Sequence, residues 1–245
     1  NGLAPLSSTT GSSLKYAQGF RDETRSAKIT YWIGRMQYSL GNMLESHLYF
    51  ERCIEMAGEL KDEEMVALSY NVIGRTCLFT TEWAKGVDYL EKGIPMLERL
   101  GHMDEVAYSM GILATICGSM GEFEKALSLN NTALEISRKI GNKTREAVTY
   151  MYLQYLTVNK GSWKESMKYG AQAIDIFKQI ENPVMEGLVI YLMGCATFYE
   201  KERKKGIDLL RIGTDKIEAT GANFTLGMGF GRRAEAHALA DQEKE

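Results

Sequence analysis

Proline is scarce in this sequence, because its 245 residues include only 3 prolines beside 24 glycines. Proline is thus well below its average frequency of about 5%, whereas glycine is above its average of about 7%. Proteins that keep their glycines in loops usually carry many prolines as well, so a loop-rich fold does not explain this composition. With 44% hydrophobic and 25% charged residues, the chain has enough apolar material for a core and does not resemble a disordered protein.

An excess of one charge and a long apolar run are also lacking. The formal net charge is −3, so the chain has no overall basic character to attract a nucleic-acid backbone or an anionic membrane. The longest uncharged run, residues 106–121, has 16 residues, fewer than the roughly 20 that a membrane helix needs. Residues 1–19 lack the basic start and the apolar segment of a signal peptide. We therefore expect a cytoplasmic fragment of a longer protein, with no nucleic-acid or membrane partner.

Cysteine and histidine are few and scattered. The four cysteines form no Cys-x-x-Cys motif, so we expect buried, reduced thiols. They are Cys53, Cys77, Cys117 and Cys195. The three histidines, His47, His102 and His237, have no partner at metal-ligand spacing, which predicts surface or boundary positions. No nucleophile elbow or phosphate-binding glycine loop is present either. We therefore predict no catalytic residues, no metal site, no cofactor and no enzymatic activity.

A repeat of 40 residues organises most of the chain, because five segments align without a gap when the sequence is shifted by that length. Three columns of this alignment hold mainly small residues. They are Gly34, Gly74, Ala114, Gln154 and Gly194; Ser46, Gly86, Ala126, Ser166 and Gly206; and Cys53, Gly93, Ala133, Ala173 and Gly213. Two packed helices lie about 8–10 Å apart and need residues without bulk where they approach most closely. The columns therefore predict contacts between helices.

Each repeat carries the signals of two helices. Apolar residues are three or four positions apart, as in Val66, Tyr70 and Ile73, which is helical spacing. Asp62, Asn142 and Asn182 are natural N-caps. Glycines suited to a left-handed C-terminal cap recur at the expected helix ends. These glycines are Gly41, Gly101, Gly121, Gly141, Gly161 and Gly221.

The predicted fold is an all-α, right-handed α-solenoid of five helical hairpins plus a C-terminal helix. The expected helices cover residues 23–40, 43–59, 62–79, 83–99, 103–119, 122–139, 143–159, 162–179, 183–200, 203–219 and 223–241. The five repeats are 23–61, 62–101, 102–141, 142–181 and 182–221. Residues 1–22 are expected to form an irregular extension, and residues 222–245 the terminal helix and tail.

These columns resemble the tetratricopeptide repeat family, whose consensus combines large and small residues at fixed offsets in two helices. In the second repeat the matching residues are Tyr70, Ile73, Gly74, Gly86 and Gly93. In the third repeat they are Met110, Leu113, Ala114, Ala126 and Ala133. HEAT-like repeats have a similar length, but the paired small columns favour tetratricopeptide repeats. The period of 40 residues, in place of the usual 34, resembles the long repeats of bacterial signalling proteins, including cyclase- and ATPase-linked arrays.

The resemblance implies that the first helices line a concave groove where a partner binds. The candidate residues at its N-terminal part are mainly polar, and those at its C-terminal part are mainly aromatic. They are Lys28, Tyr31, Arg35, Tyr38, Asn71, Arg75 and Thr115, followed by Met151, Tyr155, Tyr191 and Phe198. The cations are suited to bind a carboxylate through charge-assisted hydrogen bonds. Two alternatives stay open: Arg35 and Arg75 pair with acidic residues of adjacent helices, and the aromatic residues only pack between helices.

We therefore expect a non-catalytic scaffold or regulatory domain that binds a peptide or partner domain in this groove, within a larger signalling protein. The alternative function is a sensor that binds a small metabolite among Tyr155, Tyr191 and Phe198 inside the superhelix. Self-association is also compatible with the sequence, because terminal repeats can stack on one another.

Overall fold

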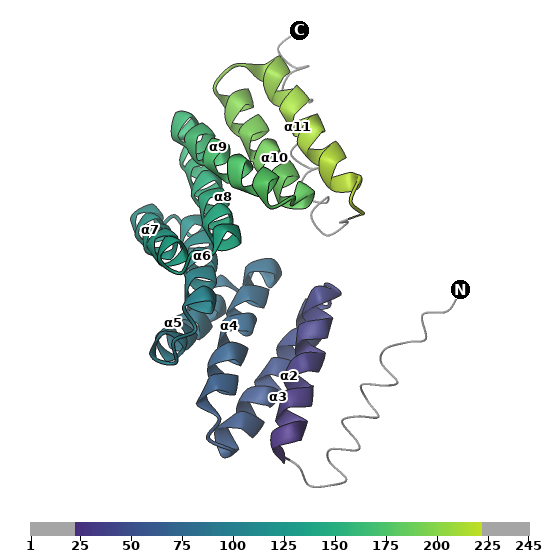
Figure 1. The fold of residues 1–245 in the computed structure, drawn as a ribbon, viewed down its shortest axis with the longest axis vertical. Helices are drawn as coiled ribbons and strands as arrows, with labels where there is room; N and C mark the ends of the chain where they lie inside the picture. Colours follow the sequence, from purple (N-terminus) through teal and green to yellow (C-terminus); the bar gives the residue numbers. More distant parts are fainter. Residues whose placement is uncertain (1–22, 222–245) are drawn as a thin grey trace, which may run out of the picture. The chain divides into compact units, whose positions relative to one another are not determined.

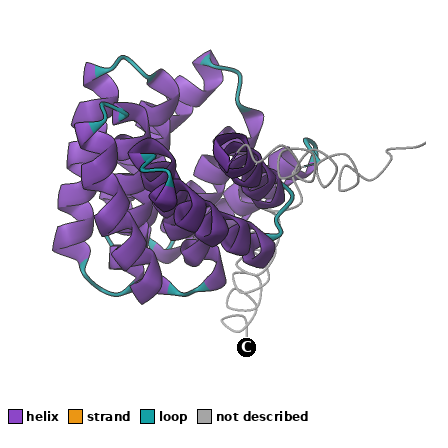
Figure 2. Ribbon diagram, turned by 90° about the horizontal axis from the view of Figure 1, so that it is seen from below, coloured by secondary structure: helices purple, strands orange, loops and turns teal. Residues whose placement is uncertain are grey.

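The computed structural model describes residues 23–221, and all structural statements concern that part of the chain. It contains the helices α2 (Glu23–Ser39), α3 (Met43–Glu59), α4 (Glu63–Thr80), α5 (Trp83–Arg99), α6 (Met103–Ser119), α7 (Phe123–Lys139), α8 (Lys143–Lys160), α9 (Trp163–Gln179), α10 (Pro183–Tyr199) and α11 (Arg203–Glu218) (Figure 1). Short loops join these helices (Figure 2). Each predicted helix between residues 23 and 219 is present, and its ends lie within one residue of the prediction. The predicted extension 1–22 and terminal helix 223–241 lie outside the described residues.

The described residues form two compact units, 23–116 and 117–221, called unit 1 and unit 2 below. In unit 1, α2 packs against α3, α3 against α4, and α4 against α5. In unit 2, the helices from α7 to α11 pack consecutively in the same way. This consecutive packing of helical hairpins confirms the predicted all-α solenoid class. Across residues 23–221, no helix combines the length and apolar character that a bilayer-spanning segment requires.

The small columns lie where paired helices touch, as predicted. All members of the columns that contain Gly206 and Gly213 are buried. A Cβ atom added to Gly206 of α11 would lie 2.6 Å from the Cα atom of Phe198 in α10. A Cβ atom added to Gly213 would lie 2.7 Å from the carbonyl oxygen of Gly187. Glycine is therefore required here because the two helices approach each other through their backbones.

The helix ends also follow the predicted cap residues. The side chains of Asp62, Asn142 and Asn182 each accept a hydrogen bond from the backbone N–H three residues later, at 2.9–3.1 Å. All six predicted cap glycines have a positive φ, between 72° and 88°. At four equivalent helix ends the residue with positive φ is not glycine. These residues are Lys61, Thr81, Glu181 and Lys201.

The burial of the cysteines agrees with the prediction, whereas the burial of one histidine does not. All four cysteines are buried and free, which confirms that prediction. His102 is half-buried, and its Nε2 atom lies 2.9 Å from Oε1 of Glu64. His47, however, is only 7% exposed, so the expected surface or boundary position is wrong for this residue. Its ring faces Thr76 of α4, at 3.5 Å, on the side of α3 that packs against the next helix. His237 lies outside the described residues.

Candidate partner-binding surface

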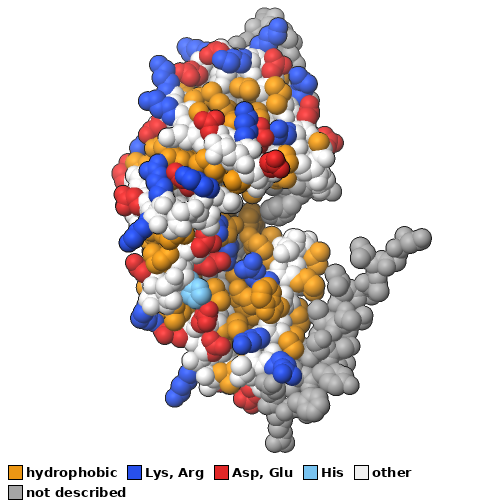
Figure 3. All heavy atoms as spheres, in the orientation of Figure 1, with side chains coloured by type: hydrophobic (Ala, Val, Ile, Leu, Met, Phe, Trp, Pro, Cys, Tyr) orange, Lys and Arg blue, Asp and Glu red, His pale blue; other side chains and the backbone are white. Residues whose placement is uncertain are grey.

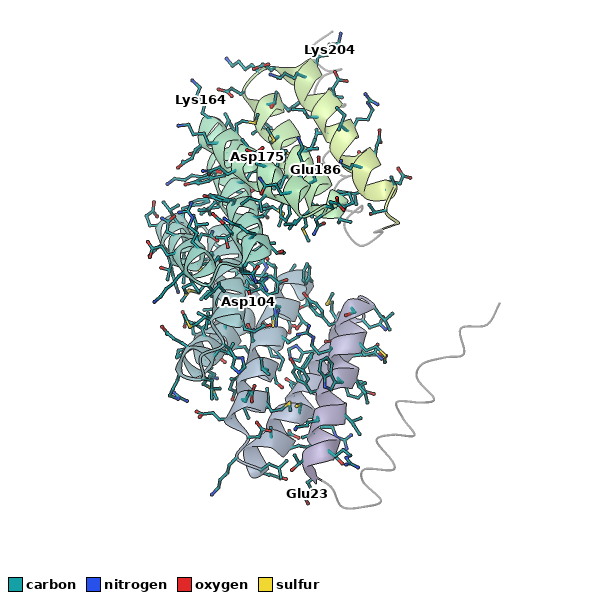
Figure 4. The ribbon with its side chains drawn as sticks, viewed as in Figure 1. Glu23, Asp104, Lys164, Asp175, Glu186 and Lys204 are labelled. Atoms are coloured by element: carbon teal, nitrogen blue, oxygen red, sulfur yellow. The ribbon has the colours of Figure 1, made fainter. Side chains whose placement is uncertain are left out.

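Glu105 is the centre of a polar cluster on the first helices of unit 1. Its Oε2 atom accepts hydrogen bonds from Nδ2 of Asn71, at 2.8 Å, and from Nη2 of Arg75, at 3.0 Å. Glu105 lies in the first turn of α6, next to Asp104, which is labelled in Figure 4. Ser109, one turn later, donates its hydroxyl proton to Oδ1 of Asn71. Of the two alternatives for Arg75, the structure therefore contains the internal ion pair.

Arg75 has more donors than this ion pair uses. Its guanidinium carbon lies 4.7 Å from the ring centroid of Tyr108, in a cation–π contact. Among the described residues, its buried Nε atom has no hydrogen-bond partner. A buried donor without a partner costs about 1–3 kcal/mol. Arg75 is thus held in place by Glu105 and Tyr108 while one of its N–H groups is unsatisfied.

Two predicted tyrosines lie beside this cluster. Burial raises the pKa of Tyr31, and the nearby charge of Arg35 opposes that effect. Burial, followed by the neighbouring Tyr108 hydroxyl, raises the pKa of Tyr38 to about 12. Both phenols are therefore protonated at neutral pH and offer O–H donors. The ring of Tyr31 also packs edge-on against Phe50, with centroids 5.4 Å apart, so this residue contributes to the core of unit 1.

The other predicted residues of unit 1 are more accessible. Lys28 is exposed on α2, and Arg35 is half-buried on the same helix. Thr115 is half-buried on α6 and donates its hydroxyl proton to the carbonyl oxygen of Gly111 at 2.9 Å. The charged groups that act on the Tyr31 hydroxyl are the guanidinium groups of Arg35 and Arg75 and the carboxylate of Glu105. Near this hydroxyl, the cations therefore outnumber the carboxylates.

The predicted aromatic residues of unit 2 are mainly packing residues. Tyr191 and Phe198 are 7% and 4% exposed, in one core cluster with Val158 and Leu210. The guanidinium carbon of Arg203 lies 5.6 Å from the ring centroid of Phe198. Met151 and Tyr155 of α8 are half-buried. Of the four predicted contacts in this unit, only these two have substantial accessible surface.

Two surface hollows among the described residues of unit 2 lie away from the predicted residues. One, of about 640 Å³, is lined by residues of α9 between Lys164 and Gln172. Another, of about 670 Å³, is lined by residues 201–205 at the start of α11. Both are on second helices and are rich in lysine. Acidic and basic side chains are interspersed on the face seen in Figure 3, in agreement with the small net charge.

Sequence reasoning missed Glu105, Tyr108 and Ser109, all on α6. The repeat alignment compares residues 40 positions apart, whereas the contacts of Glu105 and Ser109 reach 30–38 positions back to Asn71 and Arg75. Side chains of neighbouring helices meet with an offset, so a column does not list contact partners. The available signal was an acidic residue at the start of one first helix, within 30 residues of an arginine inside the previous one.

Comparison with known proteins shows the fold. No protein-family model matches the sequence, and no curated protein matches it significantly. Among solved structures, BtubC (BKLC) from P. vanneervenii is similar, with a TM-score of 0.70, 15% identity and coverage of 87% of this chain and 90% of that chain. A Rap protein complexed with Competence and Sporulation Factor is similar, with a TM-score of 0.72, 16% identity and coverage of 90% of this chain and 67% of that one.

A third similar structure is a signal transduction ATPase with numerous domains (STAND) and a tetratricopeptide repeat sensor, from Pyrococcus horikoshii. Its TM-score is 0.66 at 16% identity, and the match covers 94% of this chain and 40% of that chain. At these low identities, the TM-scores establish the architecture alone, which is that of tetratricopeptide-like repeats, as the columns predicted.

Proposed function

We propose that this chain is a non-catalytic interaction module that receives an acidic segment of a peptide or partner domain on the first helices of unit 1. The observation that carries the proposal is the pair of cations close to Tyr31 and Tyr38. The guanidinium groups of Arg35 and Arg75 act on Tyr31 together with one carboxylate, Glu105. A carboxylate from a ligand would balance the charge and accept the N–H and O–H donors of this cluster.

The buried and accessible residues have different parts in this proposal. Asn71 and Arg75 donate hydrogen bonds to Glu105, so the positive charge of Arg75 has a fixed position beneath the surface. Arg35, Lys28 and Tyr38 are accessible enough to contact the ligand directly. Within unit 2 taken by itself, Met151 and Tyr155 are proposed as contact residues, because aromatic and thioether side chains are common at protein interfaces.

The similar structures support an interaction or regulatory role. The Rap protein was solved in complex with Competence and Sporulation Factor, and the STAND protein has a tetratricopeptide repeat sensor. By analogy, we place this chain in a larger cytoplasmic signalling protein. A metabolite sensor with Tyr155, Tyr191 and Phe198 as its pocket is less well supported, because Tyr191 and Phe198 belong to the packed core of unit 2.

Peptide selection tests the proposal. Peptides are selected from a randomised library on the immobilised full chain, and their affinities are measured by fluorescence anisotropy. We expect acid-rich sequences that bind about tenfold more weakly to Arg35→Ala, because a hydrogen bond to a charged group contributes about 1.5–3 kcal/mol. The matched control is Arg52→Ala, which removes an exposed arginine from the second helix α3 and should leave binding unchanged.

Two outcomes would contradict the proposal. Selected peptides without acidic residues, or equal affinities for the wild type and Arg35→Ala, would remove the basic cluster from the binding site. If no peptide is selected, and a metabolite raises the thermal midpoint in a ligand screen, the sensor alternative is correct. Arg75 is unsuitable for this test, because replacing it leaves the half-buried Glu105 without its cationic partner and perturbs the fold.

A further inference from the structure

One buried histidine of unit 1 breaks the repeat pattern. The residues equivalent to His47 in the other four repeats are Val87, Leu127, Met167 and Ile207, all of them apolar. In unit 2, the residue equivalent to His47 is Met167, and its sulfur lies 3.8 Å from the hydroxyl oxygen of Thr197. Cys77 is the residue equivalent to Thr197 in the second repeat. In unit 1 an imidazole and a thiol therefore occupy the positions at which unit 2 has a thioether and a hydroxyl.

A carboxylate completes this group. Ligand atoms of His47, Cys77 and Glu82 all lie within 4.8 Å of one another. His47 and Cys77 are buried, whereas Glu82, the N-cap residue of α5, is exposed. Imidazole nitrogen, thiolate sulfur and carboxylate oxygen are the three ligand types that zinc takes in proteins. The residues come from α3, α4 and the start of α5, so only the folded chain assembles them.

The imidazole of His47 is oriented by a second carboxylate. Its Nε2 atom lies 3.1 Å from Oε1 of Glu51, and an ionised carboxylate only accepts hydrogen bonds, so Nε2 carries the proton. In the neutral ring, Nδ1 then carries the free lone pair. The hydroxyl of Thr76 is 3.5 Å from Nδ1 but donates its proton to the carbonyl oxygen of Ile73, at 2.7 Å. A carboxylate that holds the far nitrogen of a histidine is the usual support of a metal ligand.

We propose that His47, Cys77 and Glu82 form a binding site for a divalent cation of the zinc class, with Glu51 as the positioning residue for His47. The thiolate and the carboxylate would neutralise both charges of the ion, and Lys85, 3.5 Å from Glu51, balances the positioning carboxylate. Three protein ligands leave one position of a tetrahedral shell for water. The ion would connect the first hairpin to the second, and the site is independent of the proposed peptide surface.

Binding must displace a proton. Zinc binds cysteine as the thiolate, whereas Cys77 is a buried free thiol in the metal-free chain. The metal–sulfur bond forms as the S–H proton leaves to solvent, without any change of oxidation state.

Cobalt titration of the metal-free full chain tests the site, because Co²⁺ reports its ligands by absorption. We expect one Co²⁺ per chain, with a thiolate-to-metal charge-transfer band and the visible bands of a tetrahedral ion, and displacement of Co²⁺ by Zn²⁺. Cys77→Ser should abolish the charge-transfer band. His47→Leu should abolish binding while the fold is kept, because the other repeats have apolar residues at this position. Glu51→Gln should weaken binding about 10–100-fold.

The matched control is Cys53→Ser, which removes another buried thiol of unit 1 and should leave the titration unchanged. Absence of the charge-transfer band in the wild type, or its persistence in Cys77→Ser, would overturn the proposal. So would tight binding by His47→Leu, a variant whose helical content is checked by circular dichroism.

Discussion

The substitution Gly206→Ala tests why this chain is rich in glycine. The added Cβ atom would lie 2.6 Å from both the Cα and the N atom of Phe198 and 2.7 Å from its Cβ atom. Carbon atoms pack at about 3.5–4.0 Å, so α10 and α11 would have to separate by about 1 Å. The obstructing atoms belong mainly to the backbone of α10, so no side-chain rotation can relieve the contact.

The expected loss of stability is a difference between two effects. Overpacking in a well-packed core costs about 1–3 kcal/mol, and a clash with backbone belongs at the upper end of that range. Replacing a glycine inside a helix by alanine contributes about 1 kcal/mol in the opposite direction. We therefore expect Gly206→Ala to lower the free energy of unfolding by about 2 kcal/mol. For a chain of this size, such a loss lowers Tm by roughly 4–8 °C.

Urea denaturation followed by circular dichroism measures the global effect. Hydrogen exchange of the α10 and α11 amides measures the local one, which matters because the two compact units need not unfold together. The matched control is Gly58→Ala in α3, where an added Cβ atom meets nothing within 4 Å. This variant should be neutral or up to about 1 kcal/mol more stable. If Gly206→Ala were as stable as Gly58→Ala, the explanation of the small columns by close helix contact would be refuted.

Three further predictions concern single positions. Thr81 ends α4 with a φ of 62°, which is strained for a β-branched residue. Thr81→Gly should therefore raise the free energy of unfolding, measured by urea denaturation, by about 1 kcal/mol. Gly161→Thr, at the end of α8, should lower it by a similar amount. Glu105→Ala should lower the free energy of unfolding by about 1–3 kcal/mol, because it removes the carboxylate partner of buried Arg75. The exposed control Glu98→Ala should change this free energy by less than about 0.5 kcal/mol. Equal losses would contradict a structural ion pair. Burial opposes ionisation of Glu146, yet hydrogen bonds from Lys143 and Arg138 hold the pKa of this carboxyl below its ordinary value. The ionised Glu146 therefore stabilises the fold above the unfolded-chain pKa of about 4.3, and this stabilisation is lost as the pH falls through the lower folded-state pKa. The stability advantage of the wild type over Glu146→Gln should shrink below about pH 4. A pH-independent advantage would contradict this reasoning.

Helix ends were predictable because each depends on residues that are close in the chain. A carboxylate or amide at Asp62 or Asn182 caps the backbone N–H three residues later, and this geometry needs no tertiary contact. Glycine at positions such as Gly41 and Gly141 allows the left-handed turn that ends a helix. Thr81 and Lys61 show the limit of this rule, since the backbone makes the same left-handed turn there with residues that do not favour it.

Contact partners between helices were less predictable. Arg75 was recognised as a candidate, but its ion pair with Glu105 depends on how α4 and α6 lie against each other. Tyr191 and Phe198 were candidates for a binding surface, yet both are buried in the core of unit 2. Helical periodicity identifies which residues share a face, but it does not identify how much of that face a neighbouring helix covers.

By itself, the sequence determined the architecture, because the cap residues and the small columns recur with a period of 40 residues and so repeat the same helical hairpin along the chain. Only the tertiary structure decided which polar groups meet. The proposed metal ligands are up to 35 positions apart and belong to three helical segments, so their spacing in the sequence does not predict that they lie close together. They are His47, Cys77 and Glu82. The physical reason is that a repeat specifies the path of the backbone, whereas chemistry depends on side chains that this path brings together.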